Sequence, residues 1–207
     1  MPLVDVDLTI DAAPLPGEVR RFLRDAEQRI ELFQRHSPVP GFVPSDFEAG
    51  FRILRSLAAT VLVPGTLFCE WGSGFGVVAC LAAMLDFDAY GIEIEEELVA
   101  AAQRLATDFE LPVEFIRGSF IPSVARADAS LESSFSWLST SECGRDDELG
   151  LSTSDFGVIF AYPWPDEEVL TEGLFAKYAQ VGAILVTHHG GEDFRIRRKT
   201  SGRIPRR

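Results

Sequence analysis

Apolar residues in the first part of the chain recur at spacings of three and four, the period of one face of an α-helix. The first run predicts an amphipathic helix over residues 17–35, with apolar positions at Val19, Phe22, Leu23, Ala26, Ile30 and Phe33. Pro38 and Pro40 then interrupt the pattern. A second helix is predicted to open at Ser45, because Glu48 follows three residues later and completes a capping box. The pair Pro64-Gly65 ends this second run.

Beyond Gly65 short apolar runs alternate with helical ones, which is typical of strands joined by crossover helices into a parallel sheet. Five strands are predicted, over residues 66–71, 89–93, 113–116, 156–161 and 183–186, and the run 194–199 is a candidate for a sixth. Asp166 is predicted to cap the helix that follows the fourth strand. We therefore expect one α/β domain over residues 1–207, with two N-terminal helices and a doubly wound, mainly parallel sheet of five to six strands.

The pattern fails between residues 123 and 154. Nine of these 32 residues are serine and six are acidic, and only scattered apolar side chains remain. Such a composition predicts an insertion or a mobile flap. A short helix resting on the edge of the sheet is the alternative.

The formal net charge of −13 is unevenly distributed along the chain. Residues 195–207 hold seven basic residues and no acid, so the remainder carries 12 basic residues against 32 acidic ones. An acidic body of this kind repels nucleic acid and anionic lipid surfaces. The basic tail is expected to be solvated, with contact to a phosphate or an acidic partner as the alternative.

No apolar run reaches the roughly 18 residues that a membrane-spanning helix needs, and the residues near Met1 include acids where a signal peptide carries bases. We therefore expect a cytoplasmic protein without a membrane segment. Cys69, Cys80 and Cys143 make an odd number with no CxxC pair, which predicts neither a disulfide framework nor a zinc site.

A glycine-rich segment follows the first predicted strand and opens the next helix. Gly72, Gly74 and Gly76 stand at every second position, with Glu70 two residues ahead. This spacing differs from the GxGxxG of dinucleotide-binding turns. A carboxylate at the strand end disfavours a pyrophosphate and suits an ammonium group, and Glu93 at the end of the second strand suits the two hydroxyls of a ribose. Together they predict a site for a nucleoside that carries a cationic amino acid.

With these residues the chain, from about Ser45 to His189, resembles the class I S-adenosylmethionine-dependent methyltransferases, whose first motif is an acid followed by GxGxG and whose second is an acid ending the next strand. The resemblance implies that S-adenosylmethionine is the cofactor and that a methyl group is transferred by in-line displacement. The cofactor-binding residues that it implies are Glu70, Trp71, Gly72, Ser73, Gly74, Gly76, Glu93, Ile94, Ser119 and Phe120. Many relatives have an acid where Ser119 stands, at the edge of the adenine.

The acceptor is expected beyond the carboxyl ends of the central strands. Tyr162-Pro163-Trp164 stands where amino-group methyltransferases of the family carry Asn/Asp-Pro-Pro-Tyr/Phe, but it lacks their carboxamide or carboxylate. Tyr162 and Trp164 are therefore candidates for an aromatic wall that favours a cationic acceptor, or they pack under the loop. His188, followed by His189, ends the fifth strand and is a candidate base. A metal site there lacks further ligands at suitable spacing.

The segment from Gly41 to Ser45 resembles an element that closes over the cofactor in some small methyltransferases, including protein-lysine methyltransferases with a Tyr/Phe-Val-Pro segment. After His189 the chain is shorter than the helix and antiparallel strand pair of usual members. A shortened sheet is therefore expected, or an uncovered edge that takes a partner chain, which would give a homo-oligomer.

The acceptor is expected to be a protein lysine, another amine or a small molecule, and nucleic acid is disfavoured by the acidic body. Two other functions are considered. One is a noncatalytic module that binds S-adenosylmethionine or another nucleoside and regulates a partner enzyme. The other is a nicotinamide-dependent oxidoreductase, which the glycine spacing disfavours.

Overall fold

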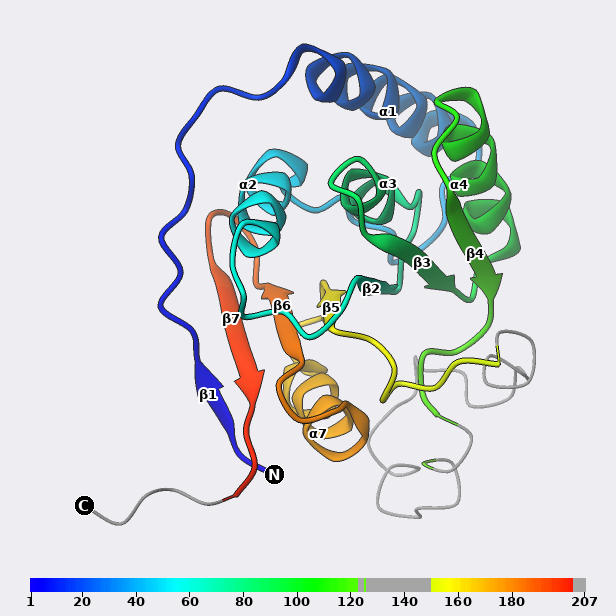
Figure 1. Cartoon of the computed structure of the whole chain (residues 1–207). Coiled ribbons are helices and arrows are strands. Elements are labelled where there is room, and N and C mark those ends of the chain that lie inside the picture. Colours follow the sequence, from blue (N-terminus) through cyan, green and yellow to red (C-terminus); the bar gives the residue numbers. More distant parts are fainter. Residues whose placement is uncertain (123–124, 126–149, 203–207) are drawn as a thin grey trace.

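The computed structural model of the chain describes residues 1–122, 125 and 150–202 (Figure 1). Most of the predicted insertion, residues 123–124 and 126–149, lies outside the described residues. The end of the predicted basic tail, residues 203–207, lies outside them as well.

In the described part of the chain one mixed sheet has seven strands, in the order β1-β7-β6-β5-β2-β3-β4. The strands are Leu3–Asp5 (β1), Leu67–Trp71 (β2), Asp88–Glu93 (β3), Val113–Arg117 (β4), Val158–Ala161 (β5), Ile184–His188 (β6) and Phe194–Lys199 (β7). Strands β2 to β6 are mutually parallel, whereas β7 and β1 run antiparallel to their neighbours. The winding reverses between β2 and β5, so the carboxyl ends of these strands form the crevice where open α/β sheets bind ligands.

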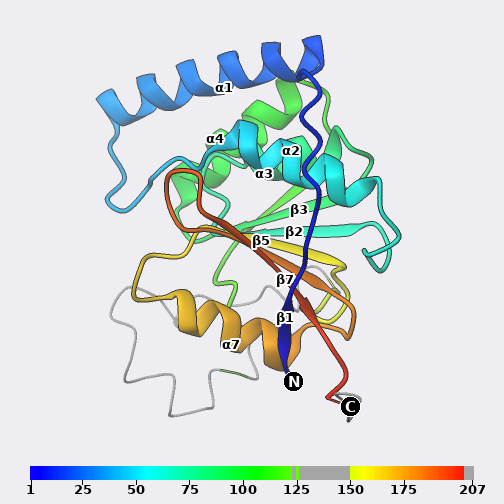
Figure 2. The ribbon, with the colours of Figure 1, turned by 90° about the vertical axis from the view of Figure 1, so that its left-hand side faces the viewer.

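Helices cover both faces of this sheet. Those of the described residues are Gly17–His36 (α1), Phe47–Ala58 (α2), Val77–Ala83 (α3), Glu96–Asp108 (α4) and Glu168–Tyr178 (α7). Figure 2 shows α7 on one side of the sheet and the other four helices on the opposite side, with α1 outermost. The predicted doubly wound α/β architecture with two N-terminal helices is confirmed.

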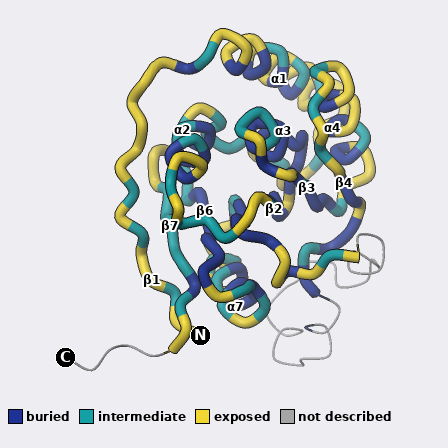
Figure 3. Tube along the Cα trace, viewed as in Figure 1, coloured by how far each residue is buried: buried dark blue, intermediate teal, exposed yellow. Residues whose placement is uncertain are grey.

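Buried apolar side chains lie on both faces of the central strands. The trace of β6, which is buried along its whole length, is dark blue in Figure 3. Along β2, Phe68 belongs to the core under α2, α3 and α4, whereas Cys69 belongs to the core under α7. This alternation follows from the two-residue period of a strand. Because both faces are covered, β5 and the first part of β6 are continuous apolar runs rather than alternating ones.

The N-terminal segment supplies a strand that the hydrophobic pattern did not predict. The sheet therefore has seven strands rather than five to six. In β1, Leu3 pairs with Lys199 and Asp5 with Arg197, so the chain's own N-terminal segment covers the outer edge of β7. Three residues are too few to show a period, which explains why the strand was missed. The edge that motivated the expectation of a partner chain is occupied by β1.

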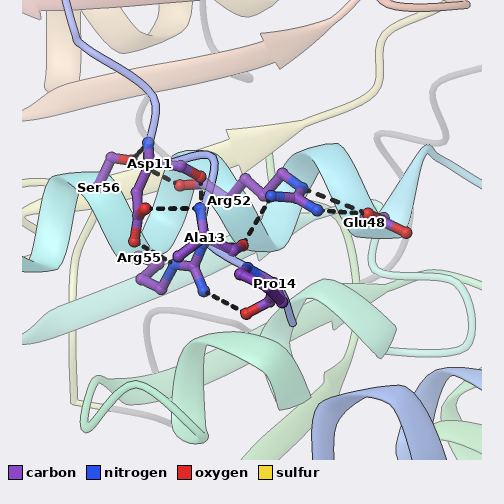
Figure 4. Close-up of polar contacts among 7 residues, drawn as sticks. All are labelled: Asp11, Ala13, Pro14, Glu48, Arg52, Arg55 and Ser56. Atoms are coloured by element: carbon purple, nitrogen blue, oxygen red, sulfur yellow. Dashed lines mark hydrogen bonds and ion pairs between the residues drawn. The ribbon is translucent and has the colours of Figure 1, made fainter. Parts of the chain in front are cut away.

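The segment between β1 and α1 is held on α2 by two arginines of that helix (Figure 4). Arg55 donates hydrogen bonds from Nη2 to the carbonyl oxygens of Asp11 and Ala13, at 3.1 and 2.9 Å. Arg52 donates from Nη1 to the carbonyl oxygen of Ala13, at 2.9 Å. The N–H of Asp11 donates to Ser56 Oγ at 2.9 Å. These contacts fix the N-terminal segment along the outside of α2.

The first part of the predicted basic tail is a structured strand rather than a solvated segment. Arg195 and Arg197 of β7 pair with Glu168 and Glu172 of α7, at 3.4 and 2.5 Å. Lys199 is 2% exposed, and its ammonium group donates to carbonyl oxygens at the end of α7. Glu168 and Glu172 of α7 therefore form ion pairs with two basic residues, Arg195 and Arg197, that lie in a stretch of the sequence without acids.

Two helix starts differ from the prediction. The N-cap of α2 is Asp46, whose side chain accepts a 2.9 Å hydrogen bond from the N–H of Ala49. Ser45 is therefore not the cap, although both residue types favour that position. In α7 the N-cap is Glu167 without a side-chain bond, so Asp166 does not cap this helix.

Candidate functional site

The glycine turn joins β2 to α3 at the carboxyl edge of the sheet. Gly72, Gly74 and Gly76 have φ angles of 68°, 52° and 67°. Residues with a Cβ rarely adopt this left-handed region. These φ angles therefore favour glycine at all three positions, whatever binds there.

The three glycines differ in what surrounds them. A Cβ at Gly76 would lie 2.3 Å from the ring of Phe115, and one at Gly74 would lie 2.6 Å from the ring of Phe42. At Gly72 no atom lies within 4 Å of such a Cβ. Gly76 is thus required by the packing of α3 on β4, whereas Gly72 leaves an open surface on the turn.

Glu70 and Glu93 lie on the same face of the sheet. In the parallel register Glu70 is level with Gly91 of β3. Gly91 and Glu93 are two residues apart on one strand, so their side chains share a face. The two carboxyl groups are close enough for Glu93 to raise the pKa of Glu70.

Glu70 also organises the start of α3. It is 6% exposed, and its Oε2 accepts a 2.8 Å hydrogen bond from the N–H of Ala79 in the first turn of the helix. Burial raises the pKa of this carboxyl well above its usual value, against the bond from Ala79, and the charge of Glu93 adds to the rise. Glu70 is therefore a cap for α3 as well as a candidate partner for an ammonium group.

Glu93 ties the turn to the end of β3. Its Oε2 accepts a 2.8 Å hydrogen bond from the N–H of Gly74. Its Oε1 accepts bonds from the N–H groups of Ile94 and Glu95, at 2.7 and 3.0 Å. Burial raises the pKa of Glu93, and these three bonds oppose the rise. Because a carboxylate offers about four lone-pair positions, about one remains for a ligand unless a backbone bond is exchanged.

Two polar atoms at the turn are buried without a hydrogen-bond partner, the Oγ of Ser73 and the Nε1 of Trp71. Ser73 is 5% exposed, and its Oγ lies over Gly91, 2.9 Å from where a Cβ of that glycine would stand. Buried polar atoms are nearly always satisfied in native structures, so the Oγ of Ser73 beside Gly72 is a candidate ligand contact. Trp71 belongs to the core under α7, on the other face of the sheet.

The loop after β4 lies beside Glu93. The N–H of Gly118 donates a 2.8 Å bond to the carbonyl oxygen of Glu93. Ser119 is buried, and its Oγ accepts a 3.2 Å bond from the N–H of Ile121. The ring of Phe120 is stacked on Trp71, with centroids 5.1 Å apart and planes 9° apart. All the residues implied for the cofactor thus gather around the carboxyl ends of β2, β3 and β4.

The aromatic residues after β5 occupy two environments. The ring of Tyr162 lies against His188, with centroids 4.2 Å apart. Trp164 is 51% exposed, and its Cζ2 is 3.8 Å from where a Cβ of Gly41 would stand. Tyr162 therefore packs at the base of this loop, while Trp164 presents about half of its surface to solvent.

His188 is buried and both of its ring nitrogens are engaged. Nδ1 lies 2.8 Å from Ser45 Oγ, and Nε2 lies 3.0 Å from the carbonyl oxygen of Gly191. A carbonyl oxygen only accepts, so Nε2 carries the hydrogen and Nδ1 accepts from the serine hydroxyl. For His188 to serve as a base, the bond from Ser45 must first break.

His189 points into a different network. Its Nε2 lies 2.8 Å from Thr187 Oγ1 and its Nδ1 lies 2.9 Å from Glu168 Oε1. This contact, with Arg195, lowers the pKa of Glu168. Among the residues that the structure describes, no group of three or more His, Cys, Asp or Glu side chains is placed to bind a metal ion.

Sequence reasoning did not foresee the contacts of Phe42 and Ser45. Phe42 packs on Gly74 and is stacked on Phe75, with centroids 5.7 Å apart. Ser45 reaches His188, 143 residues later in the chain. The resemblance of residues 41–45 to a closing element was the only sequence signal that placed this segment near the site.

The sequence matches no protein family profile and no curated protein. Solved structures do match. An O-methyltransferase from Bacillus cereus in complex with SAH superposes over 85% of this chain and 67% of its own, with 14% identity and a TM-score of 0.52. The O-methyltransferase TomG from Streptomyces achromogenes in complex with SAM superposes over 85% and 66%, with 15% identity and a TM-score of 0.50. This chain thus spans about two thirds of the length of those enzymes.

Among the described residues, none of the helices combines the length and the apolar character needed to cross a membrane.

The order of strands, the glycine turn after β2 and these superpositions all indicate the same fold. The chain therefore has the Rossmann-like fold of class I methyltransferases.

Proposed function

We propose that this chain is an S-adenosylmethionine-dependent methyltransferase that holds the cofactor on the turn between β2 and α3. One observation carries the proposal: Glu70 and Glu93 flank, on one face of the sheet and at its switch point, a glycine turn that is open at Gly72. Two solved proteins of the same fold are bound to SAH or SAM. The noncatalytic module is the alternative.

The residues at the turn fit this cofactor. The open surface at Gly72 leaves room for a ligand to approach the backbone, and Ser73 Oγ is a buried hydroxyl that lacks a partner. Glu93 would accept from the ribose, and Glu70 would lie near the amino-acid end. An ammonium group beside Glu70 would oppose the effect of burial and lower the pKa of that carboxyl again. When bound, S-adenosylmethionine supplies a methyl group on a sulfonium.

The acceptor would lie beyond β5 and β6, at Trp164 and Tyr162. A half-exposed tryptophan face attracts a cation by about 0.5–2 kcal/mol, depending on how far the site is desolvated. The acidic composition of the chain outside residues 195–207 favours a cationic partner as well. We therefore propose an amine acceptor, such as a protein lysine or a small amine, with other small molecules as the alternative.

Catalysis in this proposal comes from alignment of the acceptor with the methyl carbon. His188 is engaged through both nitrogens, so it is not free to accept a proton from the acceptor. An acceptor amine that is attracted as a cation must first lose its proton to solvent water, and the neutral amine then attacks the methyl carbon without a base at the site.

Two observations on the acceptor side favour the noncatalytic module as a second candidate. Neither Ala161, the last residue of β5, nor Tyr162 after it offers a carboxamide or a carboxylate, and both ring nitrogens of His188 are engaged. A chain that binds S-adenosylmethionine but transfers no methyl group would have these features.

Calorimetric titration with S-adenosylmethionine, S-adenosylhomocysteine and NAD tests the cofactor. We expect binding of the first two and none of NAD, and NAD binding alone would overturn the proposal. Labelled S-adenosylmethionine with basic peptides, free amines and a cell lysate then tests transfer. Incorporated label supports the methyltransferase, whereas cofactor binding without transfer to any acceptor supports the module.

A further inference from the structure

A short segment between α1 and α2 crosses the carboxyl edge of the sheet. We call residues 41–45 the bridging segment. Gly41 faces Trp164 in the loop after β5, Phe42 packs on Gly74 after β2, and Ser45 bonds to His188 at the end of β6. One stretch of five residues thus contacts the proposed cofactor turn, the loop after β5 and the end of β6.

Phe42 is fixed against the glycine turn by aromatic packing. Its ring is stacked on Phe75 of the turn with an interplanar angle of 27°, and Phe75 is packed edge-to-face against Phe33 of α1, with centroids 5.2 Å apart. The ring covers Gly74, whereas the surface at Gly72, two residues earlier, is open. Phe42 is itself only half-buried, so an apolar surface borders the open part of the turn.

Ser45 is held at the other end of the bridging segment. His188 is 3% exposed and lies between two aromatic rings, Tyr162 at 4.2 Å and Phe194 at 4.3 Å between centroids. The bond from its Nε2 to Gly191 fixes the ring against rotation about χ2. The imidazole is therefore oriented by three contacts, and its Nδ1 presents one acceptor to the hydroxyl of Ser45.

We infer that His188 is a positioning residue that holds the bridging segment across the site through Ser45, so that Phe42 forms one wall of the cofactor pocket. The second half of this inference rests on the proposed function. It assigns His188 a role other than that of a base, because breaking its bond from Ser45 would release the segment that shapes the pocket.

Removal of the Ser45 hydroxyl tests the first half without any ligand. Ser45→Ala is compared with Ser56→Ala, which also removes a serine hydroxyl that bonds to a distant part of the chain, in this case accepting from the N–H of Asp11. The readout is hydrogen exchange at the amide of Phe42, which donates a 3.2 Å bond to the carbonyl oxygen of Val39. We expect exchange at least about tenfold faster in Ser45→Ala only, which corresponds to about 1.4 kcal/mol of local opening free energy.

A conservative variant separates the hydroxyl from the rest of the side chain. Ser45→Thr keeps a hydroxyl that can donate to Nδ1, so we expect its exchange rate at Phe42 to return toward that of the parent chain. Unchanged exchange in Ser45→Ala, or equal acceleration in Ser56→Ala, would show that His188 does not hold the segment.

The second half is tested with S-adenosylhomocysteine by calorimetry. Phe42→Ala removes the ring from the turn, whereas Val181→Ala changes a side chain outside the bridging segment that is 49% exposed. We expect Phe42→Ala to raise Kd about tenfold and Val181→Ala to leave it unchanged. An unchanged Kd in Phe42→Ala would show that the ring is no wall, and a lower Kd would show that it obstructs the site.

The two halves fail separately. If the parent chain binds no S-adenosylhomocysteine, the proposed function and the wall are both rejected, and the exchange rates still decide whether His188 holds the bridging segment. If the parent chain binds the ligand and Phe42→Ala binds it equally well, the proposed function stands and the wall alone is rejected.

Discussion

Gly76 leaves no space for a side chain, because a Cβ there would lie 2.3 Å from the ring of Phe115. Gly72 has almost the same φ angle, 68° against 67°, but is open on its outer side. A substitution at Gly72 therefore tests only the strain of a left-handed residue, whereas the same substitution at Gly76 adds a steric clash with Phe115.

Alanine at these two glycines should give different results. Gly72→Ala should lower the free energy of unfolding by about 1–2 kcal/mol, the cost of a left-handed residue. Gly76→Ala should lose a further 1–3 kcal/mol or so from overpacking against Phe115. Urea unfolding measures both. Equal losses would mean that Phe115 moves aside without cost.

Gly72→Ala should also weaken ligand binding. In Gly72→Ala the new methyl group stands on the open surface, so S-adenosylhomocysteine should bind about tenfold or more weakly. Calorimetry on the folded variant measures this. Undiminished affinity would place the ligand elsewhere on the turn.

The buried carboxyl of Glu70 should make stability depend on pH. Burial raises its pKa above the usual 4.5, so above that pH the folded chain keeps a proton that the unfolded chain has released. The free energy of unfolding therefore falls as pH rises toward the native pKa. Glu70→Gln removes this titration and still accepts a hydrogen bond from Ala79. Urea unfolding between about pH 5 and about pH 8 should show a steeper fall for the parent chain. Parallel profiles would contradict the assignment.

Loss of Arg55 should destabilise the N-terminal segment more than loss of an exposed arginine. Arg55→Ala removes the bonds to Asp11 and Ala13 and the ion pair with Asp11. Hydrogen bonds to charged groups contribute about 1.5–3 kcal/mol, so we expect a loss in this range and faster exchange at the Asp11 amide. Arg35→Ala, which removes only an exposed pair with Glu31, should change stability by less than about 0.5 kcal/mol. Equal effects would show that the segment is not anchored by α2.

The acceptor proposal makes a prediction about the two aromatic residues. Trp164→Ala should lower the rate of methyl transfer to a cationic acceptor about threefold or more, because the tryptophan face is the stronger cation partner. Tyr162→Phe removes only a hydroxyl and should leave cofactor binding unchanged. Transfer assays with labelled S-adenosylmethionine measure the rates, and calorimetry measures cofactor binding. An unchanged rate in Trp164→Ala would end the proposal.

The parts of the fold predicted from sequence are those with a long apolar period. Helices α1 and α2 and the strands around the glycine turn were placed to within a few residues, because each buries a continuous apolar face. The strand β1 was missed since three residues carry no period, and its pairing with β7 is decided by backbone hydrogen bonds across the whole chain.

The residues of the candidate site also differ in how far they could be predicted from sequence. Glu70, the glycines and Glu93 were placed together by their order along adjacent strands. The engagement of His188 by Ser45 was not predictable, because Ser45 also fits the helix cap that Asp46 occupies. Serine and aspartate are both favoured as N-caps. In the structure Ser45 bonds to His188 instead, and Asp46 is the cap.

Whether Glu93 holds the cofactor is measured by calorimetry with S-adenosylhomocysteine, on the parent chain, on Glu93→Ala and on Glu97→Ala, which changes an exposed side chain as a control. We expect the parent chain and Glu97→Ala to bind equally. Glu93→Ala should lose about 1.5–3 kcal/mol of binding free energy, roughly tenfold to a hundredfold or more in Kd. A folded Glu93→Ala variant that binds as tightly as the parent chain would show that Glu93 does not hold the ligand.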